Sequence, residues 1–224
     1  MHNVIDPRLR RWTTVLGALA LALALRTSAH AAVSCSLTDP DRDVRKAFST
    51  STGYRTEFHS VKEEGGEAFR RQFEALYGRP LDPYAEYDIQ HAFYPVLKGK
   101  ELIGYMYGAT QKGKLGTLQV IAITDPTGSK ITSIYYQKLS APWAKQLKAE
   151  EFTKQFAGLT LADFKGWQTD PKYAGKLSAI KAPTPESQPD VTETLWGLKK
   201  VLMLFDHYYR QDVTLKMWMK GAGQ

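Results

Sequence analysis

The sequence has one cysteine and no apolar run long enough to cross a membrane as a helix. Because Cys35 is alone, no intramolecular disulfide can form, and a folded domain must be held by its hydrophobic core. The apolar stretch LGALALALAL at 16–25 has ten residues, whereas a spanning helix needs roughly 20. These patterns exclude a domain held together by intramolecular disulfides and a membrane-spanning helix.

Motifs for several common chemistries are missing as well. His59, His91 and His207 share no metal-ligand spacing, and there is no Gly-x-Ser-x-Gly, Cys-x-x-Cys-His or phosphate-binding loop. The formal net charge is +7, but the basic residues form no stripe and no nucleic-acid motif. We therefore expect neither a metal centre nor a nucleic-acid partner.

The first thirty-one residues have the three parts of a secretory signal. Arg8, Arg10 and Arg11 form a basic head before the apolar run, and Ala29-His30-Ala31 offers small residues for cleavage. Cleavage after Ala31 leaves 193 residues (224 − 31) with a charge of +4 (26 basic, 22 acidic). This predicts a periplasmic or otherwise extracytoplasmic protein.

Cys35 allows two interpretations close to that cleavage site. The residues before it, Ala32-Val33-Ser34, form a weak lipobox, so membrane attachment is expected only if Cys35 carries a lipid. Otherwise Cys35 is a buried or free thiol.

The stretch from Glu101 to Phe156 predicts three successive strands followed by a helix. Turn residues are concentrated at 111–116 (QKGKLG) and 125–130 (DPTGSK), and the segment between them, Thr117 to Thr124, is apolar and β-branched. Phe152 and Phe156 then recur at helical spacing within 149–156. A sheet with a helix packed on it is the expected arrangement.

The flanking segments add helices and one strand. Residues 67–76 carry apolar side chains at helical spacing, 89–97 alternate as a strand, and Gly99 predicts a hairpin into the next strand. Asp190 and Glu193 have the spacing of a capping box before a long helix at 191–208. The fold class is therefore α+β, with a mainly antiparallel sheet and packed helices.

These pieces, taken in order, resemble the FMN-binding domain. The matching residues are Gly104 at the head of a strand, Asp125 to Ile131, Pro142, and Phe152-Thr-Lys-Gln155-Phe156-Ala-Gly158. That domain occurs in the C subunit of the sodium-translocating NADH:quinone oxidoreductase, the G subunit of Rnf complexes and periplasmic regulators of nitrous-oxide reduction. The segments are then a signal peptide (1–31), an N-terminal part with short helices (32–89), an FMN-binding-like core (90–210) and a C-terminal edge strand or tail (211–224).

The resemblance implies an exported electron carrier that works with a redox protein or a membrane electron-transfer complex. In the family, FMN is often joined to the last threonine of Asp-x-x-Ser/Thr-Gly-Ala-Thr at the start of the last helix. The corresponding stretch here, 188–196, reads QPDVTETLW and lacks Ser-Gly-Ala, which leaves Thr192 and Thr194 as candidate acceptors. Further candidate flavin contacts are Ser140, Pro142, Trp143 and Tyr105, although Trp143 equally suits the core.

Two functions follow. The first is an electron-transfer protein that holds FMN covalently or non-covalently. The second is a flavin-free periplasmic binding or assembly module that keeps the fold without the acceptor motif.

Overall fold

A six-stranded antiparallel sheet forms the centre of the computed structural model, which describes residues 35–168 and 172–221. Strands β3 to β6 pair in chain order, and the short β1 and β2 both pair with β3, near its opposite ends. The α+β class and the antiparallel sheet are thus confirmed. The strands are β1 (Gly53–Tyr54), β2 (Glu57–His59), β3 (His91–Lys98), β4 (Glu101–Gly113), β5 (Gly116–Thr124) and β6 (Ile131–Leu139).

The predicted turns form where their residues indicated. Gly99 adopts a positive φ of 61° between β3 and β4, a conformation that favours glycine. Two residues, Lys114 and Leu115, join β4 to β5. In the turn before β6, the Asp125 carboxylate accepts hydrogen bonds from two backbone N–H groups, at 3.0 and 3.1 Å. Local sequence determined all three turns.

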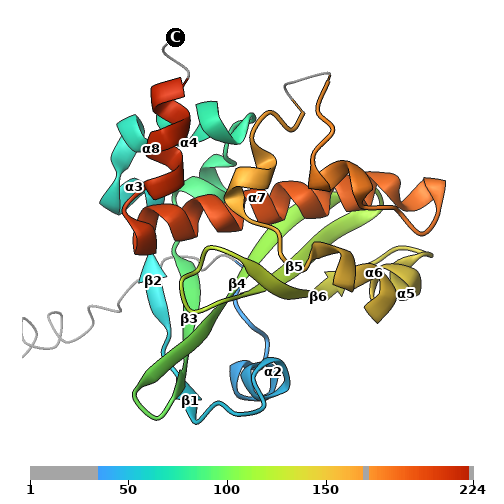
Figure 1. Ribbon diagram of the computed structural model, residues 1–224, viewed down its shortest axis with the longest axis horizontal. Coiled ribbons are helices and arrows are strands. Elements are labelled where there is room, and N and C mark those ends of the chain that lie inside the picture. The colour runs from blue at the N-terminus through green and yellow to red at the C-terminus, as the bar shows by residue number, and fades with distance from the viewer. Residues whose placement is uncertain (1–34, 169–171, 222–224) are drawn as a thin grey trace, which may run out of the picture. The chain divides into compact units, whose positions relative to one another are not determined.

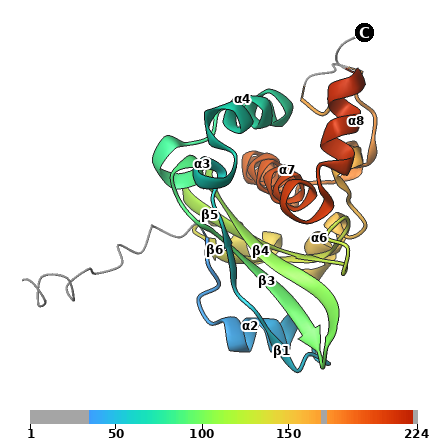
Figure 2. The ribbon, with the colours of Figure 1, turned by 90° about the vertical axis from the view of Figure 1, so that its left-hand side faces the viewer.

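The sheet is covered on both faces (Figure 2). Helix α7 (Gln188–Arg210) packs on one face, with α4 (Gly66–Tyr77) and α8 (Val213–Gly221) beside it, and α2 (Pro40–Ala47) lies against the other. Side chains alternate accordingly along β3: Phe93 belongs to the α7 side, whereas Ala92 and Tyr94 belong to the α2 side. Two apolar cores therefore lie back to back.

Helix α7 crosses the sheet at close range because of Gly197 (Figure 1). A Cβ atom built at this position would lie 3.2 Å from both Ala109 Cβ on β4 and Val120 Cγ1 on β5. A larger side chain would push the helix away from the strands. Gly197 thus sets the spacing between the helix and the sheet.

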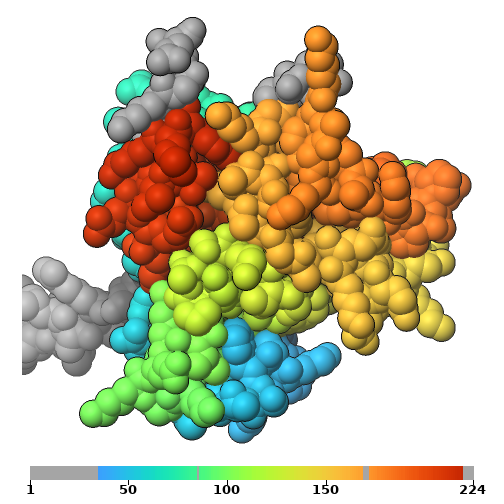
Figure 3. All heavy atoms as spheres, in the orientation of Figure 1, coloured from blue at the N-terminus to red at the C-terminus, as the bar shows by residue number. Residues whose placement is uncertain are grey.

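Irregular structure fills the rest of the domain. The segment after β6, coloured yellow to orange in Figure 3, covers much of the surface seen in that view, next to α8 in red. The remaining helices are α3 (Val61–Glu64), α5 (Ala144–Leu147), α6 (Glu150–Thr153), a π-helical turn at Pro83–Tyr87, and 3₁₀ turns at Lys154–Phe156, Leu161–Phe164, Lys176–Ala179 and Pro185–Ser187. The helix predicted at 149–156 is therefore split into α6 and a 3₁₀ turn.

The start of α7 differs from the prediction. The helix begins at Gln188, and Asp190 lies inside its first turn instead of capping it. The 3₁₀ turn Pro185–Ser187 leads into the helix and is closed by Thr184 and Ser187, whose hydroxyl donates to the Thr184 carbonyl at 2.7 Å. Asp190 is thereby released for contacts outside the helix.

The C-terminal segment is a helix, so the expected edge strand is wrong. The buried Asp206 carboxylate accepts hydrogen bonds from the N–H groups of Thr214 and Leu215 at 2.8 and 2.9 Å, which satisfies the first turn of α8. Gln211 and Asp212, both with positive φ, turn the chain between α7 and α8. This cap comes from the preceding helix, and local alternation gave no sign of it.

The predicted signal peptide lies outside the described residues. Cys35, where the described chain begins, is buried against the α2 face of the sheet, and burial raises the pKa of its thiol to about 11. Among the described residues, no helix is long and apolar enough to cross a membrane.

Candidate binding cleft beside helix α7

The structure brings the predicted 140–143 loop next to the start of α7, through a buried hydrogen bond. Trp143 Nε1 donates to Asp190 Oδ2 at 2.7 Å, and the other oxygen of the same carboxylate accepts the Lys114 backbone N–H at 2.7 Å. The Lys114 ammonium lies 5.2 Å from the Trp143 ring centroid. Trp143 is only 9% exposed. It is therefore a core residue that ties the loop to the helix.

Thr194 does not have the environment of a phosphate acceptor. Its side chain is fully buried under α7, where its hydroxyl donates to the Asp190 carbonyl at 2.7 Å and contacts the Tyr136 hydroxyl at 2.9 Å. Burial raises the pKa of Tyr136, so this phenol stays protonated. A flavin phosphate cannot reach Thr194 without separating the helix from the sheet.

Thr192 faces outward, into a groove of about 520 Å³ that we call the Thr192 groove. Its hydroxyl donates to the Gln188 carbonyl at 3.1 Å, and Lys112 and Lys114 line the same groove. Thr192 is thus the candidate acceptor that a ligand can approach.

The other predicted flavin contacts do not converge. Ser140 and Pro142 are exposed on the loop after β6. Tyr105 packs at the far end of α7, with ring centroids 5.2 Å from Phe205 and 4.8 Å from Tyr209. Because a helix rises about 1.5 Å per residue, Tyr209 lies roughly 25 Å along α7 from Thr192. Tyr105 therefore belongs to a separate part of the core.

The start of α7 also offers few free donors to a phosphate. Pro189 has no N–H, and the N–H of Gln188 donates to the Pro185 carbonyl. The carboxylates of Asp190 and Glu193 lie in the same turn of helix. FMN bound through Thr194, or held by the helix N-terminus, does not fit these residues.

A larger hollow, of about 760 Å³, lies on the other side of Glu193, between α7, the β4–β5 hairpin and the loop after α4. We call it the cleft. It shares Lys112 and Glu193 with the Thr192 groove. Its lining residues are Arg70, Tyr77, Arg79, Pro80, Leu81, Asp82, Pro83, Glu86, Thr110, Gln111, Lys112, Gly116, Thr117 and Glu193.

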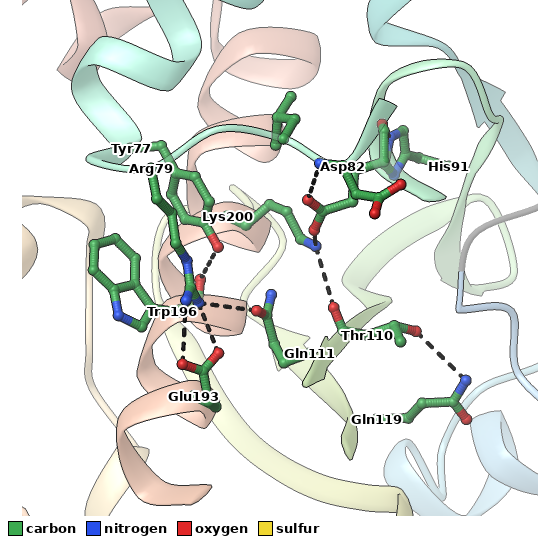
Figure 4. A network of polar contacts seen from close by, with 12 residues as sticks. Tyr77, Arg79, Asp82, His91, Thr110, Gln111, Gln119, Glu193, Trp196 and Lys200 are labelled. Carbon is green, nitrogen blue, oxygen red and sulfur yellow. Dashed lines mark hydrogen bonds and ion pairs between the residues drawn. The ribbon is translucent and has the colours of Figure 1, made fainter. Parts of the chain in front are cut away.

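Arg79 holds one wall of the cleft through charged and aromatic contacts (Figure 4). Its two terminal nitrogens donate to the Glu193 carboxylate at 3.1 and 2.8 Å, a paired geometry that arginine favours. The guanidinium also stacks on Trp196, with its carbon 4.3 Å from the ring centroid. Trp167 lies 4.8 Å from Trp196. The Trp196 ring is thus already in contact with Arg79 and with a second indole.

Gln111 lines the cleft and has a buried amide nitrogen that is unpaired in the described part of the chain. It is 8% exposed, and its Oε1 accepts a hydrogen bond from Arg79 Nη2 at 3.0 Å. Its Nε2 is buried and has no hydrogen-bond partner among the described residues. Figure 4 shows the amide oxygen turned toward Arg79, which leaves the nitrogen for another acceptor.

A second polar group supports the opposite wall. Lys200, 1% exposed, pairs with Glu86 from the π-helical turn, and its ammonium lies 3.4 Å from the Thr110 carbonyl. His91 Nε2 donates to the Glu86 carbonyl at 2.8 Å, so Nδ1 accepts from the Tyr107 hydroxyl at 2.6 Å. Burial, followed by the charge of Lys200, lowers the pKa of His91 to about 4. His91 is therefore neutral at physiological pH.

Sequence reasoning missed the residues that shape the cleft. Arg79 stands in no motif, and Glu193 is indicated only as part of a capping box, because their partners lie far away in sequence. Arg79 and Glu193 are 114 residues apart, and Gln111 lies in β4, a third segment. No local pattern joins them.

No family model and no curated protein matches this chain. In the part of the chain that the structure describes, no group of three His, Cys, Asp or Glu side chains is placed to hold a metal ion.

Proposed function

We propose that this chain is a flavin-free binding module that holds a small molecule in the cleft. The unpaired Gln111 Nε2 carries the proposal. Leaving a buried amide donor without an acceptor costs about 1–3 kcal/mol, a cost that a ligand oxygen at this position would remove. The hollow of about 760 Å³ falls within the size range of small-molecule sites.

The walls of the cleft are suited to binding rather than to catalysis. Two of its carboxylates are engaged in ion pairs: Glu193 with Arg79, and Glu86 with Lys200. His91 is not available as a general base, because both its ring nitrogens are used within the core. The rigid contacts around Arg79 instead provide a preorganised wall, which lowers the cost of binding.

The test is a ligand screen by thermal shift with the purified chain and two variants. Gln111→Met keeps the side-chain length and removes the donor, whereas Gln119→Met alters a neighbouring strand outside the cleft. We expect at least one compound to raise the melting temperature of the wild type and of Gln119→Met, with a smaller shift for Gln111→Met. Compounds that shift all three proteins equally would place binding elsewhere and contradict the proposal.

An exported electron carrier with covalent FMN is the second candidate, favoured by one observation. Thr192 is approachable, and Lys112 and Lys114 line its groove, where they would attract a phosphate. When bound, FMN would supply the redox chemistry, and this chain would contribute the acceptor hydroxyl and two positive charges.

This candidate can be tested separately. The protein is produced in a host that contains a flavin transferase, and its absorbance is recorded before and after denaturation. Yellow colour that survives denaturation in the wild type and disappears in Thr192→Val would support covalent FMN. A colourless wild type that takes up no added FMN would exclude this function and leave the cleft proposal intact.

A further inference from the structure

We infer that the cleft selects a small monocarboxylate with an apolar body, its carboxylate bound by Gln111 Nε2 and Lys112. This inference rests on the proposed binding function and names the ligand class.

The unused polar groups of the cleft are a hydrogen-bond donor and a cation. The unpaired atom of Gln111 is its amide nitrogen, a donor, whereas its carbonyl oxygen already accepts one hydrogen bond from Arg79. Lys112 is exposed at the mouth of the cleft and pairs with no carboxylate among the described residues. An acceptor with negative charge satisfies both groups at once.

The surrounding charges favour one negative charge. Lys199, whose ammonium lies 5.3 Å from the Trp196 ring centroid, donates to the Tyr77 carbonyl at 2.7 Å, and no carboxylate pairs with it among the residues described. Burial and the nearby Arg79 charge lower the pKa of Lys199 to about 8. In the lining, Arg70, Arg79 and Lys112 balance Asp82, Glu86 and Glu193, and the nearby Lys199 adds a positive charge. A cationic ligand would meet Arg79 and Lys112 without using the Gln111 donor.

The same lining excludes ligands with more negative charge. Asp82, Glu86 and Glu193 all contribute carboxylates to the cleft, and each would repel a second charge on the ligand. Phosphate monoesters, which carry nearly two charges at neutral pH, are therefore disfavoured. A single carboxylate matches the unused groups with the least repulsion.

The remaining walls predict the apolar body. Pro80 and Pro83 supply exposed apolar surface to the lining, whereas Tyr77 and Leu81 in the same lining are only 1% and 3% exposed. Burial raises the pKa of Tyr77 to about 12, so its ring carries no charge at neutral pH. An aliphatic or aromatic group packed there gains from leaving water, as buried apolar surface does.

The experiment compares four probes of similar shape by calorimetry at pH 7.5: hexanoate, hexanamide, hexylamine and hexyl phosphate. We expect hexanoate to bind about tenfold more tightly than each of the others, because hydrogen bonds to charged groups are the stronger ones. Benzoate and benzamide provide a second pair, so that the result does not depend on one chain length.

Variants then assign the contacts. Gln111→Met and Lys112→Gln should each weaken hexanoate binding about fivefold to tenfold. Lys114→Gln, two residues after Lys112 and outside the cleft lining, should leave it unchanged. Circular dichroism checks that each variant is folded, and Gln111→Asn keeps the amide for the case in which Gln111→Met does not fold.

The two levels of the proposal fail in different ways. If hexanamide or hexylamine binds as tightly as hexanoate and depends on Gln111, the ligand class is wrong and the binding function stands. If no probe binds, and the thermal-shift screen also finds no compound that depends on Gln111, both are wrong.

Discussion

The buried Lys200–Glu86 pair gives the sharpest test of how the cleft wall is held. Lys200 is 1% exposed and Glu86 15% exposed, so their environments differ. Glu86→Gln removes the charge that compensates a fully buried ammonium, which keeps only neutral acceptors, the new amide oxygen and the Thr110 carbonyl at 3.4 Å. Lys200→Met removes the ammonium and leaves a carboxylate that still accepts the Asp82 N–H at 2.8 Å and reaches some water.

The expected costs are therefore unequal. Removing one member of a buried pair costs about 3–5 kcal/mol, and we assign this range to Glu86→Gln. For Lys200→Met we expect about 1–2 kcal/mol, since methionine fills much of the buried space and the remaining carboxylate keeps a donor. The double variant should be more stable than Glu86→Gln alone, because no buried charge is left without a partner.

Urea unfolding followed by tryptophan fluorescence measures these differences, with the m-value as a check that the unfolding transition is unchanged. The control is Glu150→Gln, which breaks an exposed pair with Lys154 at 2.7 Å and should produce no measurable change. Equal losses for Glu86→Gln and Lys200→Met, with additive effects in the double variant, would refute the reasoning, because they would show that the two charges do not depend on each other.

Three further predictions concern the elements around the cleft. The pKa of His91 is lowered to about 4 from an ordinary 6.5, so the unfolded chain takes up a proton at higher pH than the folded chain. The free energy of unfolding should therefore fall by about 3 kcal/mol between pH 6.5 and 4. In urea titrations, His91→Gln should make the free energy of unfolding less dependent on pH in this range. Gly197→Val should cost about 1–3 kcal/mol through overpacking against the sheet, seen as a lower urea midpoint, and Gly197→Ala should cost less. Asp206→Ala removes the cap of α8 and should cost about 1–2 kcal/mol, with faster amide exchange in α8 than in α7; equal exchange in both helices would argue against this capping role.

Local patterns predicted the sheet well, because its determinants are local. Alternation in 89–97 and the turn residues at Gly99 and 125–130 act over a few residues, and the strands and hairpins formed where expected. The errors came where a distant group decides the outcome. Asp206 caps α8 from the preceding helix, and the alternating residues of the tail gave no indication of that.

The candidate site was beyond local prediction for the same reason. The resemblance to the FMN-binding domain indicated candidate site residues in the loop at 140–143 and at the start of the last helix. These two segments are in contact, through the hydrogen bond between Trp143 and Asp190. What the sequence could not tell is that this contact is buried. Arg79, Gln111 and Glu193 come together only when three separate segments pack, so no spacing in the chain relates them.

The geometry of α7 explains how one stretch of helix serves both the core and the cleft. Asp190 and Thr194, four residues apart, share the face toward the sheet and use their polar atoms inside the core. Glu193 and Trp196, three residues apart, share the neighbouring face and meet Arg79. Thr192 points away from both, into its own groove. A ligand can therefore reach α7 from the Glu193 side or the Thr192 side, and the variants Gln111→Met and Thr192→Val separate these two routes.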